Sequence, residues 1–213
     1  MPDQMVVFGD SQAEGVVVGL RRVSRKGPAF TIANRAKAGT AIGQPPYDWP
    51  AVIAEYAGQE AGRAPVAICL FGGNDRLPMR PANAPAMPFR SGAWETVYRE
   101  RVSAMMASLA VAGVAVLWLG EPMCREARYS GDMAYLNGIY EDVAKVVSVV
   151  HLDKPAVRYM PLWDVVSDGA GHFAAYGQGP EGKQERLRLD DGIHFTPAGY
   201  ELVAQRVMTA LLA

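Results

Sequence analysis

The stretch that decides the fold is residues 5–22, which read MVVFGDSQAEGVVVGLRR. Its opening residues form a short apolar run with β-branched members, which predicts a buried strand over Met5–Gly9. Helix-forming sequence follows almost at once and predicts a helix over Glu14–Arg22. A strand that passes directly into a helix is typical of a parallel sheet covered by helices on both faces.

The same alternation of short apolar runs and longer amphipathic stretches continues to the end of the chain. The further strands that it predicts are Phe30–Ala36, Val66–Phe71, Val114–Leu119 and Val157–Leu162. The further predicted helices are Pro50–Gly62, Ala93–Ala112, Met133–Val149 and Pro197–Leu212. The pattern therefore predicts an α/β fold with a five-stranded parallel sheet.

Local signals mark two of the helix ends. Thr196 is a good N-cap residue, and Pro197 after it suits the first helical position. Gly113 follows the third long helix, where a glycine commonly ends a helix. Residues 76–92 and 164–190 fit neither the strand pattern nor the helix pattern. They are expected to be long loops over the carboxyl ends of the strands, where ligands bind.

Composition limits the classes of protein that this chain can be. With 213 residues, half of them apolar, it can bury one core without metals or disulfides, so one domain over residues 1–213 is expected. The net charge of −1 argues against nucleic acid or an anionic membrane surface as a partner. Cys69 and Cys124 are expected to be free thiols, because no residues at metal-ligand spacing surround them.

No cofactor or metal site is predicted, and no apolar run is long enough to span a bilayer. The amino terminus enters its first strand at once, without the basic and apolar regions of a signal peptide. A soluble chain is expected, either cytoplasmic or periplasmic or secreted if a leader has been removed. The oligomeric state is left open.

The first candidate for chemistry is Ser11, in the turn Gly9-Asp10-Ser11 between the first strand and the first helix. A hydroxyl at such a turn lies at the carboxyl edge of the sheet, beside a helix N-terminus that favours developing negative charge. The alternative is that Ser11 only caps the helix, since serine is a leading cap residue. The tripeptide alone does not decide between them.

The second candidate is the pair Asp191 and His194, in a turn before the last helix. A carboxylate three residues before a histidine can fold back toward the imidazole Nδ1–H and leave Nε2 facing outward as a base. The alternative is a capping turn whose histidine packs locally. The neighbouring Asp190 is a rival for the orienting role.

Two further turns carry candidate hydrogen-bond donors. Gly72-Gly73-Asn74-Asp75 follows the third strand, where paired glycines allow close backbone approach and the Asn74 amide can donate to an oxyanion. A simple Asn-Asp turn is the alternative. Gly39 follows the second strand and can supply a bare backbone N–H, although on its own it indicates little.

Taken together and in this order, these four blocks resemble those of the SGNH hydrolases, also called GDSL-type esterases. The wider strings YDWP, GGNDR and DGIHFTPAGY are similar to a bacterial branch of that superfamily catalogued largely as a domain of unknown function. The resemblance covers nearly the whole chain. It implies a three-layer α/β/α fold with flavodoxin-like strand order.

The resemblance also implies a role for each matching residue. Ser11 would be the nucleophile, His194 the general base and then acid, and Asp191 its orienter, because the family's spacing selects Asp191 over Asp190. The N–H groups of Ser11 and Gly39 and the side chain of Asn74 would hold the oxyanion. The chain departs from the family at Gln12, where leucine is usual, which changes the packing of the turn or adds a polar group near the substrate.

Several other side chains have weaker claims. His172 could line the substrate site but suits an exposed loop better, and His151 is expected to be solvated or locally bonded. Arg76 and Arg80 could meet a substrate carboxylate or phosphate, although solvated charges are more common. Three aromatic residues could form a wall for a sugar, with core packing as the usual alternative: Trp49, Trp163 and Phe173.

The predicted function is a serine-dependent ester hydrolase that removes short acyl groups, such as acetyl, from a carbohydrate or similar alcohol. The same residues could instead pass the acyl group to an acceptor glycan. A hypothesis of another class is a non-catalytic carbohydrate-binding module on the same fold. A phosphate-binding α/β protein is disfavoured, because no Walker-type lysine or dinucleotide glycine pattern is present.

Overall fold

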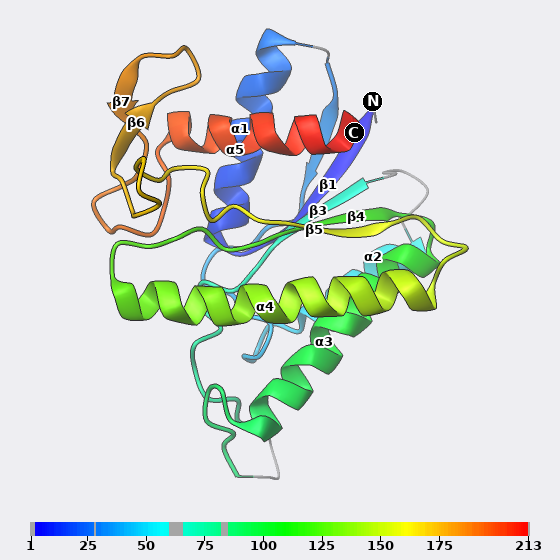
Figure 1. The fold of residues 1–213 in the computed structure, drawn as a ribbon. Helices are drawn as coiled ribbons and strands as arrows, with labels where there is room; N and C mark the ends of the chain where they lie inside the picture. The colour runs from blue at the N-terminus through cyan, green and yellow to red at the C-terminus, as the bar shows by residue number, and fades with distance from the viewer. Residues whose placement is uncertain (1–2, 28, 60–65, 82–84, 213) are drawn as a thin grey trace.

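The computed structural model describes residues 3–27, 29–59, 66–81 and 85–212. Its centre is a five-stranded parallel sheet with the order β2-β1-β3-β4-β5 (Figure 1). The strands are β1 (Gln4–Gly9), β2 (Thr31–Asn34), β3 (Val66–Leu70), β4 (Ala115–Leu119) and β5 (Val157–Met160). This is the flavodoxin-like order, so the predicted fold class is confirmed.

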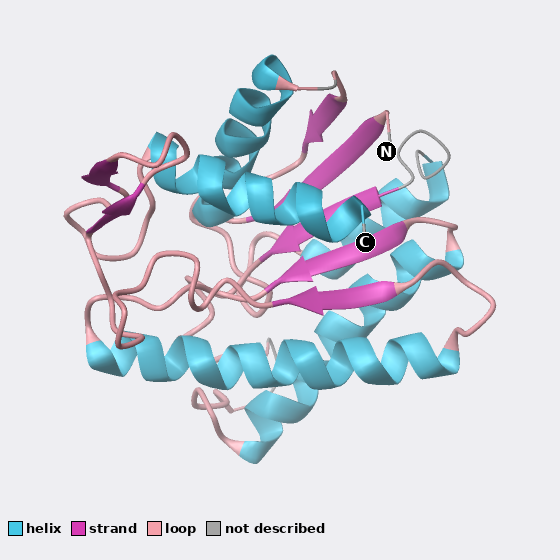
Figure 2. Cartoon of the chain, turned by 45° about the horizontal axis from the view of Figure 1, so that its top comes forward, coloured by secondary structure: helices cyan, strands magenta, loops and turns pink. Residues whose placement is uncertain are grey.

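Helices cover both faces of this sheet (Figure 2). On one face lie α1 (Ser11–Lys26) and α5 (Pro197–Leu212), and on the other lie α2 (Trp49–Gln59), α3 (Gly92–Val111) and α4 (Ala127–Val150). Alternate side chains of β1 point to the two helical layers. Val6 and Phe8 join the apolar cluster beneath α2, α3 and α4, whereas Met5 and Val7 join the cluster beneath α1 and α5.

The predicted elements are all present, with differences at their ends. The helix predicted over Glu14–Arg22 begins at Ser11 and continues to Lys26, because the Asp10 carboxylate accepts the Gln12 N–H at 2.9 Å and caps an earlier first turn. The helix predicted over Met133–Val149 begins at Ala127, where the Glu126 side chain accepts two N–H groups of the first turn. Of the helix predicted over Pro50–Gly62, residues 60–62 lie outside the described residues.

The local stop and start signals act as expected. Gly113 has a φ of +86°, a left-handed conformation that glycine adopts freely, directly after α3. Thr196 Oγ1 accepts the Gly199 N–H at 3.2 Å and starts α5 at Pro197, as predicted.

The late loop is not entirely irregular, which corrects the prediction for residues 164–190. It contains an antiparallel hairpin of β6 (Tyr176–Gln178) and β7 (Gln184–Arg186). Its strands have three residues each, too few to show a readable alternation of apolar and polar residues. The earlier loop is closed by one antiparallel bridge between Met79 and Met87.

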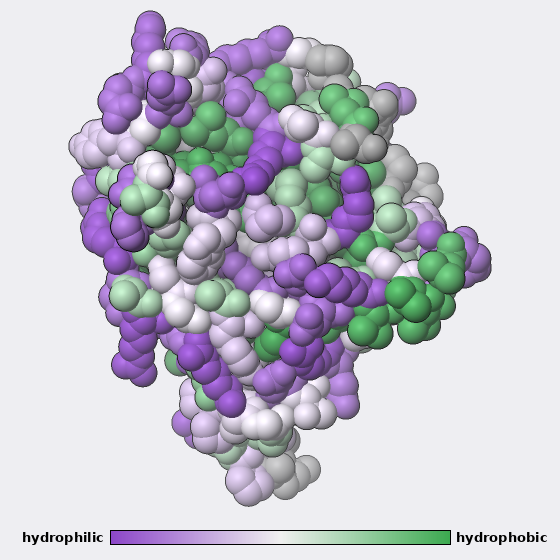
Figure 3. All heavy atoms as spheres, in the orientation of Figure 1, coloured by the Kyte–Doolittle hydropathy of each residue, from purple (hydrophilic) through white to green (hydrophobic). Residues whose placement is uncertain are grey.

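Both cysteines are free and buried, Cys124 as well as Cys69. Within the described part of the chain, no helix has the length and apolar character needed to cross a membrane. Apolar side chains do gather on the surface near the end of α4 (Figure 3), where Val146, Val149, Val150 and Leu152 are each more than half exposed.

The contact between α1 and α5 depends on two glycines. A Cβ on Gly15 would lie 1.9 Å from the Tyr200 ring, and a Cβ on Gly19 would lie 2.0 Å from the Tyr200 carbonyl oxygen. Because a carbonyl oxygen in a helix cannot rotate away, Gly19 sets how closely the two helices approach.

Replacing Gly19 tests this constraint. Gly19→Ala should lower the free energy of unfolding by about 1–3 kcal/mol, because the added methyl group must push α5 away. Gly138→Ala in α4 is the matched control, since a Cβ there meets nothing within 4 Å, and it should raise stability by up to about 1 kcal/mol. Urea denaturation of both variants measures the difference, and equal effects would contradict the proposed constraint.

Candidate active site

Each residue of the Gly9-Asp10-Ser11 turn has a different structural role. Gly9 has a φ of +145°, and a Cβ there would lie 1.9 Å from the Leu70 carbonyl oxygen, so β1 can end beside β3 only with glycine. Asp10 is the N-cap, and Ser11 is the first residue of α1. The helix-capping alternative for Ser11 is therefore wrong, and its hydroxyl is available for another partner.

That partner is His194, which comes from the far end of the chain. Ser11 Oγ lies 2.8 Å from His194 Nε2, and His194 Nδ1 lies 2.7 Å from Asp191 Oδ2. The structure thus brings three of the predicted site residues into one chain of hydrogen bonds. The His194 side chain is 29% exposed, so a molecule from solvent can reach this arrangement.

The turn before α5 fixes the Asp191 carboxylate. Its Oδ1 accepts the backbone N–H groups of Ile193 at 2.8 Å and His194 at 3.0 Å. Burial opposes ionisation, but these N–H groups and the His194 ring together hold the pKa of Asp191 below its usual value. An ionised carboxylate can only accept, so Nδ1 of His194 donates to it and Nε2 is left to accept a hydrogen bond from the Ser11 hydroxyl.

The rival carboxylate has a different partner. Asp190 forms an ion pair with Arg186, and its side chain is 92% exposed. Gly192, next to Asp191, has a φ of +71°, and a Cβ there would lie 2.5 Å from Arg125 Cβ. The turn is therefore built to direct Asp191, and not Asp190, toward the imidazole.

The two other predicted donors lie side by side in a neighbouring part of the site. Asn74 Nδ2 donates to the Thr40 carbonyl at 2.9 Å, which uses one of its two N–H groups and ties the turn after β3 to the loop after β2. Lys37 N donates to the Gly9 carbonyl at 2.8 Å and holds the same loop against the Ser11 turn. Gly39, with a φ of +74°, and Asn74 both line a cleft of about 1130 Å³.

Buried acids lie beneath these turns. A Cβ on Gly73 would lie 3.3 Å from Asp10 Oδ2 and 4.0 Å from Glu121 Oε1, and the Gly73 N–H donates to Glu121 at 3.1 Å. Burial raises the pKa of Asp10 to about 7, and burial together with the Asp10 charge raises the pKa of Glu121 well above its usual value. Burial therefore favours the protonated form of Glu121.

Gln12 and Arg188 hold the His194 turn from below. Gln12 Nε2 donates to the Ile193 carbonyl at 2.8 Å, and Arg188 Nη2 donates to the same oxygen at 2.7 Å. The Gln12 Oε1 accepts the Tyr200 hydroxyl at 2.6 Å. Gln12 is 1% exposed, so of the two predicted effects of this departure from the family, the change in packing is the one observed.

Glu121 and Arg188 were missed by the sequence analysis. Glu121 had a readable signal, because an acidic residue two positions after a buried strand, at the ligand-binding edge of a sheet, is unusual. Arg188 had none, since its carbonyl partners on Met123 and Ile193 are defined only by the fold.

The residues with weaker claims fall mostly outside the site. The side chain of His172 is 76% exposed and faces Asp168, and His151 caps the end of α4. Trp49 is buried in the core, and Trp163 is partly buried and packs against that core cluster. Phe173 lies under the guanidinium groups of Arg125 and Arg188, at 5.3 and 5.0 Å.

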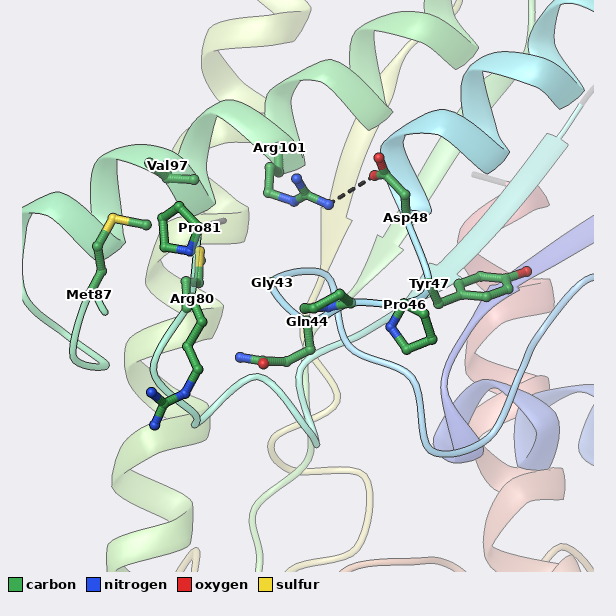
Figure 4. Close-up of a pocket in the computed structure, with 12 residues that line it drawn as sticks. Gly43, Gln44, Pro46, Tyr47, Asp48, Arg80, Pro81, Met87, Val97 and Arg101 are labelled. Atoms are coloured by element: carbon green, nitrogen blue, oxygen red, sulfur yellow. Dashed lines mark hydrogen bonds and ion pairs between the residues drawn. The ribbon is translucent and has the colours of Figure 1, made fainter. Parts of the chain in front are cut away.

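Arg76 and Arg80, the two arginines named in the sequence analysis, lie at different cavities. Arg76 lines the cleft that holds Asn74, whereas Arg80 is exposed beside a smaller cavity of about 400 Å³ (Figure 4). In that cavity Arg101 pairs with Asp48 at 2.9 Å, and the Arg80 side chain extends away from them. Over the described residues, no group of three or more His, Cys, Asp or Glu side chains is arranged to hold a metal ion.

Several solved structures share this fold at low sequence identity. An acetylxylan esterase from Geobacillus stearothermophilus matches with a TM-score of 0.63 at 9% identity, over 97% of this chain and 93% of its own. A carbohydrate acetylesterase from Sinorhizobium meliloti matches with a TM-score of 0.59 at 12% identity, over 99% of both chains. A GDSL-like lipase from Bacteroides thetaiotaomicron matches with a TM-score of 0.60 at 12% identity, over 99% of this chain and 88% of its own.

These likenesses confirm the predicted resemblance to SGNH hydrolases at the level of the fold. No curated protein sequence matches this chain. A family model does match, over residues 4–210. The chain therefore has the SGNH hydrolase fold and belongs to the family described as "Protein of unknown function (DUF459)".

Proposed function

We propose that this protein is a serine-dependent ester hydrolase that removes short acyl groups, with acetyl as the first candidate, from a carbohydrate or similar alcohol. The observation that carries the proposal is the chain of hydrogen bonds from Ser11 Oγ through His194 to Asp191, at 2.8 and 2.7 Å. An activated nucleophile needs a base within hydrogen-bond reach and a third group that orients the base. All three are present at the edge of the sheet where ligands bind in this class of fold.

The first half of the reaction forms an acyl-enzyme. His194 Nε2 takes the Ser11 proton as Oγ bonds to the acyl carbon, and the carbonyl becomes a tetrahedral oxyanion. Asp191 stabilises the resulting imidazolium. When the oxyanion collapses, the bond to the alcohol oxygen breaks and His194 gives that oxygen the proton. Water then attacks the acyl-Ser11 ester by the same route and releases the acid.

Three donors are available to the oxyanion. Ser11 opens α1, and the first N–H groups of a helix have no partner within it. Gly39 has no side chain to screen its N–H, and Asn74 retains the second hydrogen of an amide whose first is bonded to Thr40. Such donors, fixed before the reaction, account for much of the rate in serine hydrolases.

The choice of substrate class rests on the solved structures that share the fold and on the size of the cleft. Two of the structures that share the fold are named as an acetylxylan esterase and a carbohydrate acetylesterase. The cleft beside Asn74, at about 1130 Å³, is large enough for a saccharide.

Ser11→Ala should lower kcat for a short-chain acetyl ester by about a million-fold, because no other group can form the acyl-enzyme. A fluorophosphonate probe should label the native protein and not this variant. Circular dichroism of the variant controls for folding. Labelling that persists in Ser11→Ala would place the nucleophile elsewhere, and no labelling of the native protein would favour a binding module.

The two adjacent aspartates form a matched pair. Asp191→Asn should lower kcat by about ten-thousand-fold, because the amide can present its NH2 to Nδ1 and favour the wrong tautomer of His194. Asp190→Asn should leave kcat within about twofold of the native value, since that carboxylate faces Arg186 in solvent. Steady-state kinetics on the same ester compares them, and similar losses in both variants would refute the assignment.

Asn74→Ala should lower kcat by about a hundred- to a thousand-fold with little change in KM, because an oxyanion donor acts in the transition state. Circular dichroism and thermal unfolding of the variant control for the loss of its bond to the Thr40 backbone oxygen. A loss in Asn74→Ala that appears only in KM would show that the side chain binds substrate instead.

A further inference from the structure

The cleft that holds Asn74 is positively charged. Besides Gly39, Gly73 and Asn74, it is lined by Arg76, Arg90 and Arg128. Asp132 is its one acidic lining residue among those that the structure describes, so the lining carries two positive charges in excess. The whole chain has a net charge of −1, so this excess is a local feature and does not reflect the composition.

Asp132 orients two of the arginines but bonds to only some of their guanidinium N–H groups. Its Oδ2 lies 3.3 Å from Arg76 Nη1, and its Oδ1 lies 3.0 Å from Arg90 Nη2. A guanidinium group has five N–H donors, and one carboxylate cannot satisfy two such groups. Arg90 Nη2 also donates to the Gly131 carbonyl, and the other donors of Arg76 and Arg90 are left for another acceptor.

Aromatic rings hold the same two side chains in place. The Arg76 guanidinium lies 3.8 Å from the centre of the Tyr129 ring, and that of Arg90 lies 4.7 Å from the centre of the Tyr135 ring. An arginine that is already immobilised loses little conformational entropy when it binds a ligand. Their arrangement therefore suits recognition better than two freely moving surface charges would.

Arg128 adds the third charge. It lies in the first turn of α4, and its guanidinium makes no ion pair or hydrogen bond with any residue in the described ranges. The nearby Glu126 carboxylate is directed elsewhere, since its two oxygens accept the backbone N–H groups of Arg128 and Tyr129, both at 2.8 Å.

We propose that the natural substrate is an ester that carries an anionic group, a carboxylate or a phosphate, which Arg76, Arg90 and Arg128 bind while the ester carbonyl lies at Asn74. The inference rests on the proposed hydrolase function. Guanidinium groups match the planar fork of a carboxylate and the oxygens of a phosphate with paired hydrogen bonds. Since Asn74 and Arg76 are two residues apart and line one cleft, a single small ester can reach both.

Matched esters test the proposal. The first pair is the mono-p-nitrophenyl ester of adipic acid and its methyl ester, which differ in one charge on the acyl side. The second is 4-acetoxybenzoate and 4-acetoxybenzamide, which differ on the alcohol side, and 4-acetoxyphenyl phosphate extends the comparison to phosphate. Binding is measured with Ser11→Ala, which cannot turn the esters over, and kcat/KM is measured with the native protein.

In at least one pair the anionic ester should bind Ser11→Ala about tenfold more tightly than its neutral partner. Adding Arg128→Gln or Arg90→Gln should reduce that ratio several-fold, whereas adding Arg80→Gln, a cation outside the cleft, should leave it unchanged. Raising the salt concentration should also reduce it, because these side chains are partly exposed.

The two proposals fail separately. Equal binding of the charged and neutral esters, or a preference that survives loss of the cleft arginines, would overturn the anionic substrate whatever the turnover. If no ester is hydrolysed, the hydrolase function fails, while the binding ratio still decides whether the cleft selects anions.

Discussion

The close packing of α1 against α5 is the constraint on which the rest of the site depends. Ser11 begins one of these helices, and the turn that carries Asp191 and His194 leads into the other. Glycines at two positions of α1 let the Tyr200 ring and backbone approach to a distance that any side chain would prevent. The separation of the two helices therefore sets the 2.8 Å distance between Ser11 Oγ and His194 Nε2, two residues that are 183 positions apart in the chain.

Buried polar groups refine what the helix packing sets. Gln12, one residue after Ser11, bonds to the carbonyl of Ile193, one residue before His194, so the two turns are tied by their immediate neighbours. Arg188 reinforces the same carbonyl, and Glu121 supports the Gly73 turn from below. Burying such groups costs free energy unless they find partners, and the partners here are the Tyr200 hydroxyl and backbone groups of the surrounding turns. These same bonds position Ser11 and His194, the proposed nucleophile and base.

Local sequence signals predicted much of this architecture. The five strands, both ends of α5 and the four motif blocks follow from apolar periodicity, cap residues and glycines that act within a few positions. The early start of α1 at Ser11 was missed although Asp10 is a local capping signal, because the first turn contains the polar Gln12, whose side-chain partners Ile193 and Tyr200 lie far along the chain. The β6–β7 hairpin was too short to show a period, and the grouping of Arg76 with Arg90 and Arg128 needed the fold. The sequence did not predict which segments far apart in the chain contact one another.

The charge of the cleft also indicates at which stage it would act. A chain with a net charge of −1 generates no long-range field that attracts anions, and salt screens exposed charges beyond about 8–10 Å. In the proposed complex the arginines would therefore affect an ester only once it has entered the cleft, where they would slow its departure and align its carbonyl with Asn74. Binding energy from such a remote group increases kcat only if it also improves the alignment at Ser11. Because Asp132 and the tyrosine rings fix Arg76 and Arg90 in advance, an anionic ester of the proposed kind would gain alignment as well as affinity from them.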